Sequence, residues 1–239
     1  MRKTVLTILF SASIFAQTLT YKVTAPLFGE VGRVDLSYSV GKTYNISAKM
    51  KTYGFAKKLS GNRLESYNAN GTVKGNKYYA GKFVQNVTYK NKKSYLEYKF
   101  DYKKKKIYKT RHKWVDGKLK TDYKKALKYF TYNDLFSSYH NIVAELKGKP
   151  AGTYRMQVAG MEKYGGYLTI KVPNTAQQAK EAKSMGAKGA WIYHIVTNKK
   201  ILGSKNGEII FAVGNDGIAK AVRVLDIPFV SHLDAKLVR

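Results

Sequence analysis

Apolar and polar residues alternate along much of this chain with a period of two, which is the pattern of a strand with one buried face. In residues 33–40 the apolar positions are Val34, Leu36, Tyr38 and Val40. In residues 44–51 they are Tyr44, Ile46, Ala48 and Met50, and in residues 95–102 they are Leu96, Tyr98, Phe100 and Tyr102. The link Gly41-Lys42 between the first two segments indicates a hairpin.

Further strands are predicted at residues 19–25, 84–89, 106–115, 153–158, 167–172, 190–197, 208–213, 218–225 and 229–237. Between strands lie dipeptides that tolerate the positive φ angles of tight turns, namely Asn70-Gly71, Asp116-Gly117, Asn206-Gly207 and Asp216-Gly217. These markers indicate an antiparallel sheet, because a parallel one would need a helix between most strands.

Two segments have helical spacing instead. Residues 134–146 follow a cap at Asn133 or Asp134, and their apolar stripe is Leu135, Tyr139, Ile142, Val143 and Leu146. The second helix is capped by Asn174 and ends at Gly186, with Ala176, Ala179, Ala182 and Met185 on one side. Residues 54–59 are a candidate for a shorter helical turn.

Together these elements predict a mainly β protein. We expect a single antiparallel β-barrel or a strongly curved half-barrel sheet of about 10–12 strands, with two helices covering an opening or an edge. Residues 17–239 are expected to form one domain, because no Pro/Gly/Ser linker divides them. A two-part division near the helix at 134–146 is the alternative.

Residues 1–16 have the pattern of a secretory signal peptide. Arg2 and Lys3 precede an uncharged run from Thr4 to Ala16, which is shorter than the roughly 20 residues of a membrane-spanning helix. We expect cleavage after Ala16 and a periplasmic location. A buried N-terminal strand is the other interpretation.

The chain is strongly basic, and its positive charge suggests a class of ligand. The 239 residues carry 44 Lys and Arg against 15 Asp and Glu, a net charge of +29, and the hydrophobic fraction of 44 % still suffices for a core. Residues 89–128 are the most basic stretch, and we predict ligand-binding cations there at the rim of the sheet: Lys103, Lys104, Lys105, Lys106, Lys109, Arg111 and Lys113. Such a face attracts an anionic envelope lipid or polymer, or a membrane surface. Nucleic acid is less favoured, because nearly all the cations are Lys rather than the bidentate Arg. The competing interpretation is that these lysines solubilise the strands and protect their edges.

Motifs for catalysis and cofactors are missing from the sequence. There is no cysteine, no metal-binding spacing among His112, His140, His194 and His232, and no nucleophile elbow or phosphate-binding loop. No cofactor or metal is therefore expected, and the histidines are interpreted as hydrogen-bonded structural residues. Asp101 and Asp116 are interpreted as ion-paired or turn residues. An exported hydrolase using two carboxylates stays as a third hypothesis.

Several segments resemble a family of exported bacterial proteins catalogued as a periplasmic domain of unknown function. The resemblance rests on Tyr21 in residues 20–23, on Gly32, on Tyr44 and on residues 52–59 around Gly54. It continues through Asp134, Leu135 and Tyr139 and the closing hairpin 214–226 followed by Pro228. It implies an antiparallel β-barrel-like fold and brings no activity or catalytic residue, although the outline is similar to that of carriers that shield lipids or lipoproteins.

The leading hypothesis is thus a non-enzymatic periplasmic binding or envelope-maintenance protein. An apolar or lipid-like anionic ligand would lie in the curved sheet, against inward residues such as Leu36, Tyr38, Ile46, Met50, Phe100 and Leu168. The alternative is a binder of anionic polymers, such as cell-wall glycan, polysaccharide or nucleic acid, through a basic outer face.

Overall fold

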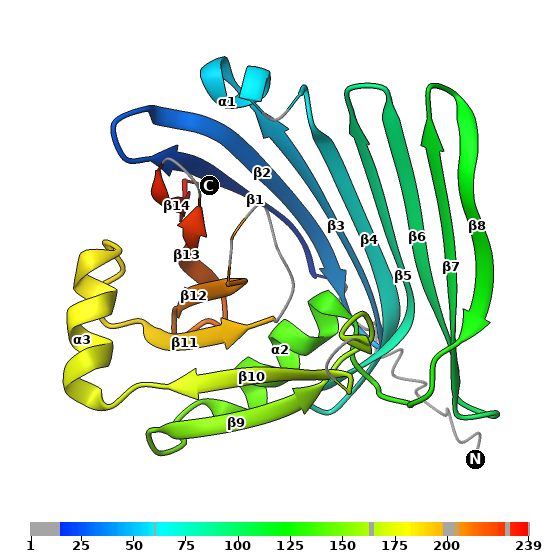
Figure 1. Ribbon diagram of the computed structural model, residues 1–239. Coiled ribbons are helices and arrows are strands. Elements are labelled where there is room, and N and C mark those ends of the chain that lie inside the picture. The colour runs from blue at the N-terminus through cyan, green and yellow to red at the C-terminus, as the bar shows by residue number, and fades with distance from the viewer. Residues whose placement is uncertain are drawn as a thin grey trace, which may run out of the picture.

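The structure is a computed structural model that describes residues 15–59, 61–162, 165–197, 204, 206–227 and 230–238. Within them, fourteen strands form one strongly curved sheet in which every recorded strand pairing is antiparallel (Figure 1). The mainly β, half-barrel architecture expected from the alternation is confirmed. The predicted signal peptide falls mostly on residues 1–14, which lie outside the described residues.

The first eight strands form a meander of successive hairpins. They are β1 (Phe15–Ala25), β2 (Gly29–Val40), β3 (Thr43–Thr52), β4 (Leu64–Lys74), β5 (Lys77–Tyr89), β6 (Lys92–Asp101), β7 (Lys106–Val115) and β8 (Lys118–Ala126). A short helix, α1 (Gly54–Leu59), links β3 to β4, as residues 54–59 suggested.

The other six strands return toward the first. They are β9 (Gly152–Gln157), β10 (Tyr167–Val172), β11 (Trp191–Val196), β12 (Glu208–Val213), β13 (Ala219–Ile227) and β14 (Ser231–Leu237). Strand β14 pairs with β1, so that Tyr21 lies opposite Leu237 and the two meanders become one sheet. The outermost strands are β8 and β9, and among the described strands these two do not pair, so the sheet stays open.

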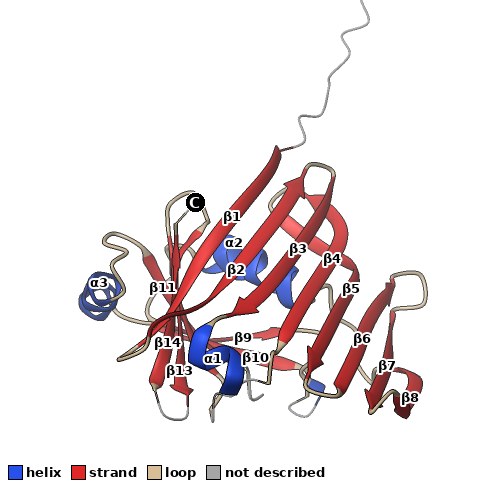
Figure 2. Ribbon diagram, turned by 90° about the horizontal axis from the view of Figure 1, so that it is seen from above, coloured by secondary structure: helices blue, strands red, loops and turns tan. Residues whose placement is uncertain are grey.

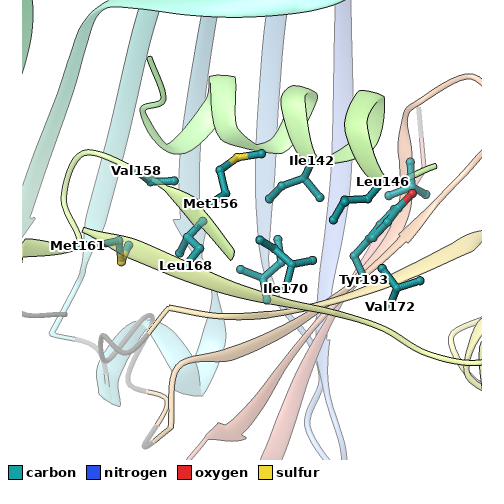
Figure 3. Packing of buried hydrophobic residues seen from close by; sticks show 11 residues of the cluster. Ile142, Leu146, Met156, Val158, Met161, Leu168, Ile170, Val172 and Tyr193 are labelled. Atoms are coloured by element: carbon teal, nitrogen blue, oxygen red, sulfur yellow. The ribbon is translucent and has the colours of Figure 1, made fainter. Parts of the chain in front are cut away.

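Helix α2 (Leu135–Leu146) lies within the curve of the sheet (Figure 2). On one side its residues Ile142 and Leu146 point toward Met156, Leu168 and Ile170 of β9 and β10 (Figure 3). On the other side Phe136 packs against Phe83 of the long meander, with ring centroids 6.2 Å apart. We call the face of the sheet against which α2 packs the inner face, and the opposite one the outer face.

Two buried polar residues, Asp134 and Asn141, hold α2 in this position. Asp134 is the N-cap and accepts hydrogen bonds from the amides of Phe136 and Ser137, both at 2.8 Å. Asn141 bonds both backbone groups of Tyr78 in β5: its Nδ2 donates to the carbonyl and its Oδ1 accepts from the amide, each at 2.9 Å. An interior helix thus satisfies the exposed backbone of the sheet as well as filling the curve.

Helix α3 (Thr175–Ser184) covers the outer face of β11–β13 instead. Ala182 and Met185 are buried there against Ile192 and Ile210, as the predicted stripe requires. The expected positions of Ala176 and Ala179 are wrong, because both are exposed. Leu135 of α2 is likewise 41 % exposed rather than part of the buried stripe.

Two strands escaped the sequence prediction, and one turn was misplaced. Strands β4 and β8 are additional to the expected ones, which brings the described number from about 10–12 to fourteen. Asn70-Gly71 is not a hairpin turn: it lies inside β4, at a register shift opposite β5. A Cβ on Gly71 would come within 2.1 Å of the carbonyl oxygen of Tyr79, so glycine is required for close strand approach at this bulge.

Candidate ligand-binding surface on the inner face

The inner face of β4–β8 changes character with distance from α2. Cross-strand pairs share a face of a sheet, so the strand register places inner side chains in rows across the strands. Next to α2 the row consists of the apolar residues Ala69, Phe83 and Tyr98 on β4–β6 and continues to Lys109 and Lys125 on β7 and β8. The next row is mixed; we call it the Arg111 row, and it consists of Tyr67, Gln85, Leu96, Arg111 and Tyr123.

Beyond it lies a second polar row, which we call the Lys113 row. It consists of Glu65, Val87, Ser94, Lys113 and Thr121. Leu96 and Val87 are buried, whereas Arg111 and Lys113 are half-buried. Apolar surface and cationic groups therefore stand side by side on this part of the inner face.

The carboxylate of Glu65 is already neutralised. It is 4 % exposed and accepts hydrogen bonds from Nε of Arg63 and from the hydroxyl of Tyr67. Gln85 donates to the same Tyr67 hydroxyl at 3.2 Å. Burial and the neighbouring Glu65 together hold the pKa of Tyr67 well above its usual range, so this hydroxyl stays protonated.

Lys109 is also paired. Its Nζ lies 2.8 Å from Glu162, which additionally accepts a hydrogen bond from Tyr98 at 2.9 Å. Burial is the largest single influence on the pKa of Glu162 and opposes its ionisation, but the hydrogen bonds from Lys109, Tyr98 and the backbone, together with the charge of Lys109, outweigh it and lower the pKa of the carboxyl. Glu162 comes from the connection between β9 and β10, so this ion pair ties that connection to the inner face of β7.

Arg111 differs from these two cations. Its Nε is buried, and within the described residues it has no hydrogen-bond partner. A buried charged donor left without a partner costs on the order of 1–3 kcal/mol or more, so each such group requires an explanation. The neighbour Lys113, two residues along the same face of β7, forms no ion pair within the described part of the chain either.

The structure divides the cations predicted from sequence into two groups. Lys103, Lys104, Lys105 and Lys106 are exposed, at the turn between β6 and β7 and at the start of β7. Lys109, Arg111 and Lys113 lie on the inner face rather than at the rim, because odd-numbered positions of β7 share the face of the fully buried Ile107. At about 3.3 Å per residue, Lys113 lies more than 20 Å along the strand from Lys106. One site cannot use all seven.

The remaining polar clusters are structural. His194 lies between two carboxylates, with Nε2 2.7 Å from Glu181 and Nδ1 3.1 Å from Glu208, which ties α3 to the sheet. Complete burial raises the pKa of Asp134 to about 6, although its hydrogen bonds favour the ionised form. The described residues hold no group of three or more His, Cys, Asp or Glu side chains placed to bind a metal ion.

Asp101 and Asp116 are turn residues, as expected. A carboxylate oxygen of Asp101 accepts from the amide of Lys104 at 2.9 Å, and Asp116 has a φ of 51° in the hairpin between β7 and β8. Tyr98 is buried as predicted, but Tyr102 is 39 % exposed, so its expected burial is wrong. Among the described residues, no helix is long and apolar enough to cross a membrane.

Comparison with solved structures identifies a chain of similar fold. It is a β-barrel-like protein of the domain of unknown function DUF1849 from Brucella abortus. The identity is 13 %, the TM-score is 0.53, and the match covers 94 % of this chain and 96 % of that one. No family model and no curated protein matches the sequence. At this identity the likeness shows the fold alone: a β-barrel-like architecture of unknown function, as the sequence resemblance implied. Membership of an exported family stays a prediction.

Proposed function

We propose that this chain is an exported, non-catalytic binding protein that holds a lipid-like anionic ligand on the inner face of its sheet. The head group binds Arg111 and Lys113, and the apolar part lies along Leu96 and Val87. The observation that carries the proposal is the buried Nε of Arg111, which has no partner among the described residues. An anionic oxygen is the group that satisfies such a donor best.

The packing of the interior favours a ligand at the Arg111 row over a ligand next to α2, where the sequence analysis expected it. Ile46, Phe100 and Leu168 are 3 %, 7 % and 2 % exposed, and they pack within the clusters that α2 completes. Side chains therefore occupy the space that an acyl chain would need next to the helix. The Arg111 row lies farther along the strands, and Arg111 as a residue is only half-buried, so a ligand can reach part of its side chain although Nε itself is buried.

Charge balance supports an anion there. Among the cations on these rows and next to them, Arg63 is paired with Glu65 and Lys109 with Glu162, while Lys92, Lys118 and Lys125 in the adjoining rows add further positive charge. Arg111 and Lys113 supply two positive charges without a recorded carboxylate partner in the described chain. A head group of one or two negative charges complements this surface, with binding less sensitive to salt than at an exposed basic face.

Export is supported by the pattern of residues 1–16. Arg2 and Lys3 before an uncharged run ending in small residues are typical of a cleaved leader. Sequencing the N-terminus of protein recovered from a periplasmic extract tests this part. A mature end at or near Gln17 is expected, and an intact Met1 in the cytoplasmic fraction would contradict export.

The binding proposal is tested with a pair of short-chain lipids that differ in charge. Calorimetric titration with dihexanoyl-phosphatidylglycerol should show saturable binding, and dihexanoyl-phosphatidylcholine should bind at least tenfold more weakly. Arg111→Gln should abolish the difference, because a charge-assisted hydrogen bond contributes about 1.5–3 kcal/mol, or tenfold and more in affinity.

The matched control is Arg33→Gln. Arg33 stands on the outer face of β2 with its Nε 2.9 Å from Glu30, so its loss removes the same charge without touching the inner face. This variant should keep the preference for the anionic lipid. Equal binding of both lipids to the unmodified protein, or a preference unchanged in Arg111→Gln, would refute the proposal.

A further inference from the structure

A row of aromatic rings lies on the outer face, away from the proposed lipid site. Tyr95 of β6 and His112 of β7 are cross-strand partners with ring centroids 5.6 Å apart, and the Trp114 ring lies 5.7 Å from that of His112. The tilts between successive rings are 31° and 38°. Together the three tilted rings form a row across two strands, which we call the platform.

The platform borders a shallow surface hollow over β5–β7. Asn86 and Thr88 of β5 and Thr110 of β7 also line this hollow. All three stand at outer positions, since the register pairs Asn86 with Tyr95 and Thr110 with Glu97. An amide and two hydroxyls, which both donate and accept hydrogen bonds, thus lie beside the aromatic rings.

The rings are held in position by carboxylates beside the hollow. The Nδ1 atom of His112 is 3.0 Å from Asp122 in β8, and the hydroxyl of Tyr95 donates to Glu97 at 2.7 Å. Glu97 is also bonded to Lys82 at 2.8 Å. The platform is therefore organised before any ligand binds, which lowers the entropic cost of recognition.

The charges distinguish between the polymers that stack on aromatic rings. A nucleic-acid strand requires several cations along its phosphates, but among the described residues that line the hollow Lys93 is the single cation. The exposed carboxylate of Asp122 places negative charge next to the rings, where a phosphate would be repelled, whereas Glu97 is already paired with Lys82. A sugar ring offers an apolar C–H face for stacking and hydroxyls for the surrounding amide and hydroxyl groups.

We infer that the hollow over β5–β7 binds a sugar ring of an uncharged glycan chain, with Trp114 and Tyr95 as the stacking residues. The site is separate from the inner face, because outer and inner positions alternate along β7. A chain that binds glycan outside and an anionic amphiphile inside can bring one to the other.

The test uses two soluble oligosaccharides and a nucleic-acid competitor. Calorimetry with β-1,4-linked hexamers of glucose and of N-acetylglucosamine should detect binding of at least one, and a 12-residue oligothymidylate should not compete. In a Trp191→Phe background Trp114 is the remaining tryptophan, so the glycan should shift its fluorescence emission.

Trp114→Ala should reduce glycan affinity at least tenfold, and Tyr95→Ala provides an independent second variant. The matched control is Tyr108→Ala, because Tyr108 is an aromatic residue on the same face of the same strand but outside the hollow. Circular dichroism confirms that each variant is folded, and Arg111→Gln should bind glycan normally, which separates this test from that of the lipid site.

The inference is overturned if neither hexamer binds, or if Trp114→Ala and Tyr95→Ala bind as tightly as Tyr108→Ala. It is also overturned if oligothymidylate binds at the hollow in place of the sugars, which would assign the platform to single-stranded nucleic acid. A loss confined to the two platform variants supports it.

Discussion

Asn141 is the residue whose removal should disturb the interior most clearly. Its side chain is 1 % exposed and makes three hydrogen bonds: two with the backbone of Tyr78 at 2.9 Å and one to Asn133 at 2.6 Å. Asn141→Ala removes all three and leaves their partners without a bond. At about 1 kcal/mol for each bond, the expected loss in the free energy of unfolding is about 3 kcal/mol.

Urea denaturation followed by circular dichroism measures this loss. With a denaturant slope of about 2–3 kcal/mol/M for a chain of this size, the midpoint should fall by roughly 1 M. The control is Glu145→Ala in the same helix, where the side chain is 48 % exposed and 3.4 Å from Lys77; it should change stability by less than about 0.5 kcal/mol.

Asn141→Asp sharpens the test. Its carboxylate can still accept from the Tyr78 amide, but it faces the Tyr78 carbonyl and the Asn133 oxygen, which need a donor. We expect it to be at least as destabilising as alanine at pH 7 and to recover partly in acid. If Asn141→Ala costs no more than Glu145→Ala, the anchoring role assigned to this side chain is refuted.

Three other predictions concern the same core. Burial lowers the pKa of His140 to about 4, below its ordinary 6.5, so its contribution to stability is full above pH 6.5 and is lost as pH falls through 4. His140→Phe should therefore reduce the acid sensitivity of the urea midpoint, by up to about 3 kcal/mol between pH 7 and 4. Asp134 acts in the opposite direction: with its pKa raised to about 6, stability falls as pH rises from 4 through 6. Asp134→Asn, which can still cap α2, should exceed the unmodified protein in urea midpoint at pH 7 but not at pH 4. Gly71→Ala should cost more than about 2 kcal/mol, because its Cβ would lie 2.1 Å from the Tyr79 oxygen, whereas Gly152→Ala, whose nearest contact is 3.8 Å, should be mild in the same denaturation assay.

Alternation of apolar and polar residues predicted a strand and its buried face correctly where the two faces of the strand differ strongly in polarity. The segments around Leu36, Ile46 and Phe100 pack on the side that their apolar positions predicted, and Asp134 begins its helix as the cap rule requires. Strand β4 was missed because its Asn and Gly residues imitate a turn. Strand β8 was missed because an edge strand buries little, and only Leu119, Tyr123 and the terminal Ala126 interrupt its polar residues.

The candidate sites were less accessible from the sequence. Parity along β7 could have shown that Arg111 shares a face with Ile107 while His112 and Trp114 point the other way. The register between neighbouring strands cannot be deduced from the alternation within one strand, because it depends on turn lengths and on the shift at Gly71. Without register, neither the Arg111 row nor the pairing of Tyr95 with His112 can be assembled.

The pairing of β1 with β14 has a consequence for the order of folding. Tyr21 and Leu237 are opposite each other in the middle of the sheet, although 216 positions separate them in the chain. The hairpins on either side connect neighbouring segments and can form within microseconds, whereas this central seam must close a loop that spans nearly all the described residues. The seam is therefore expected to form last. Until the final strand arrives the chain holds two separate meanders. Both proposed sites lie on β4–β8 of the first meander, so that half of the sheet can assemble before the seam closes.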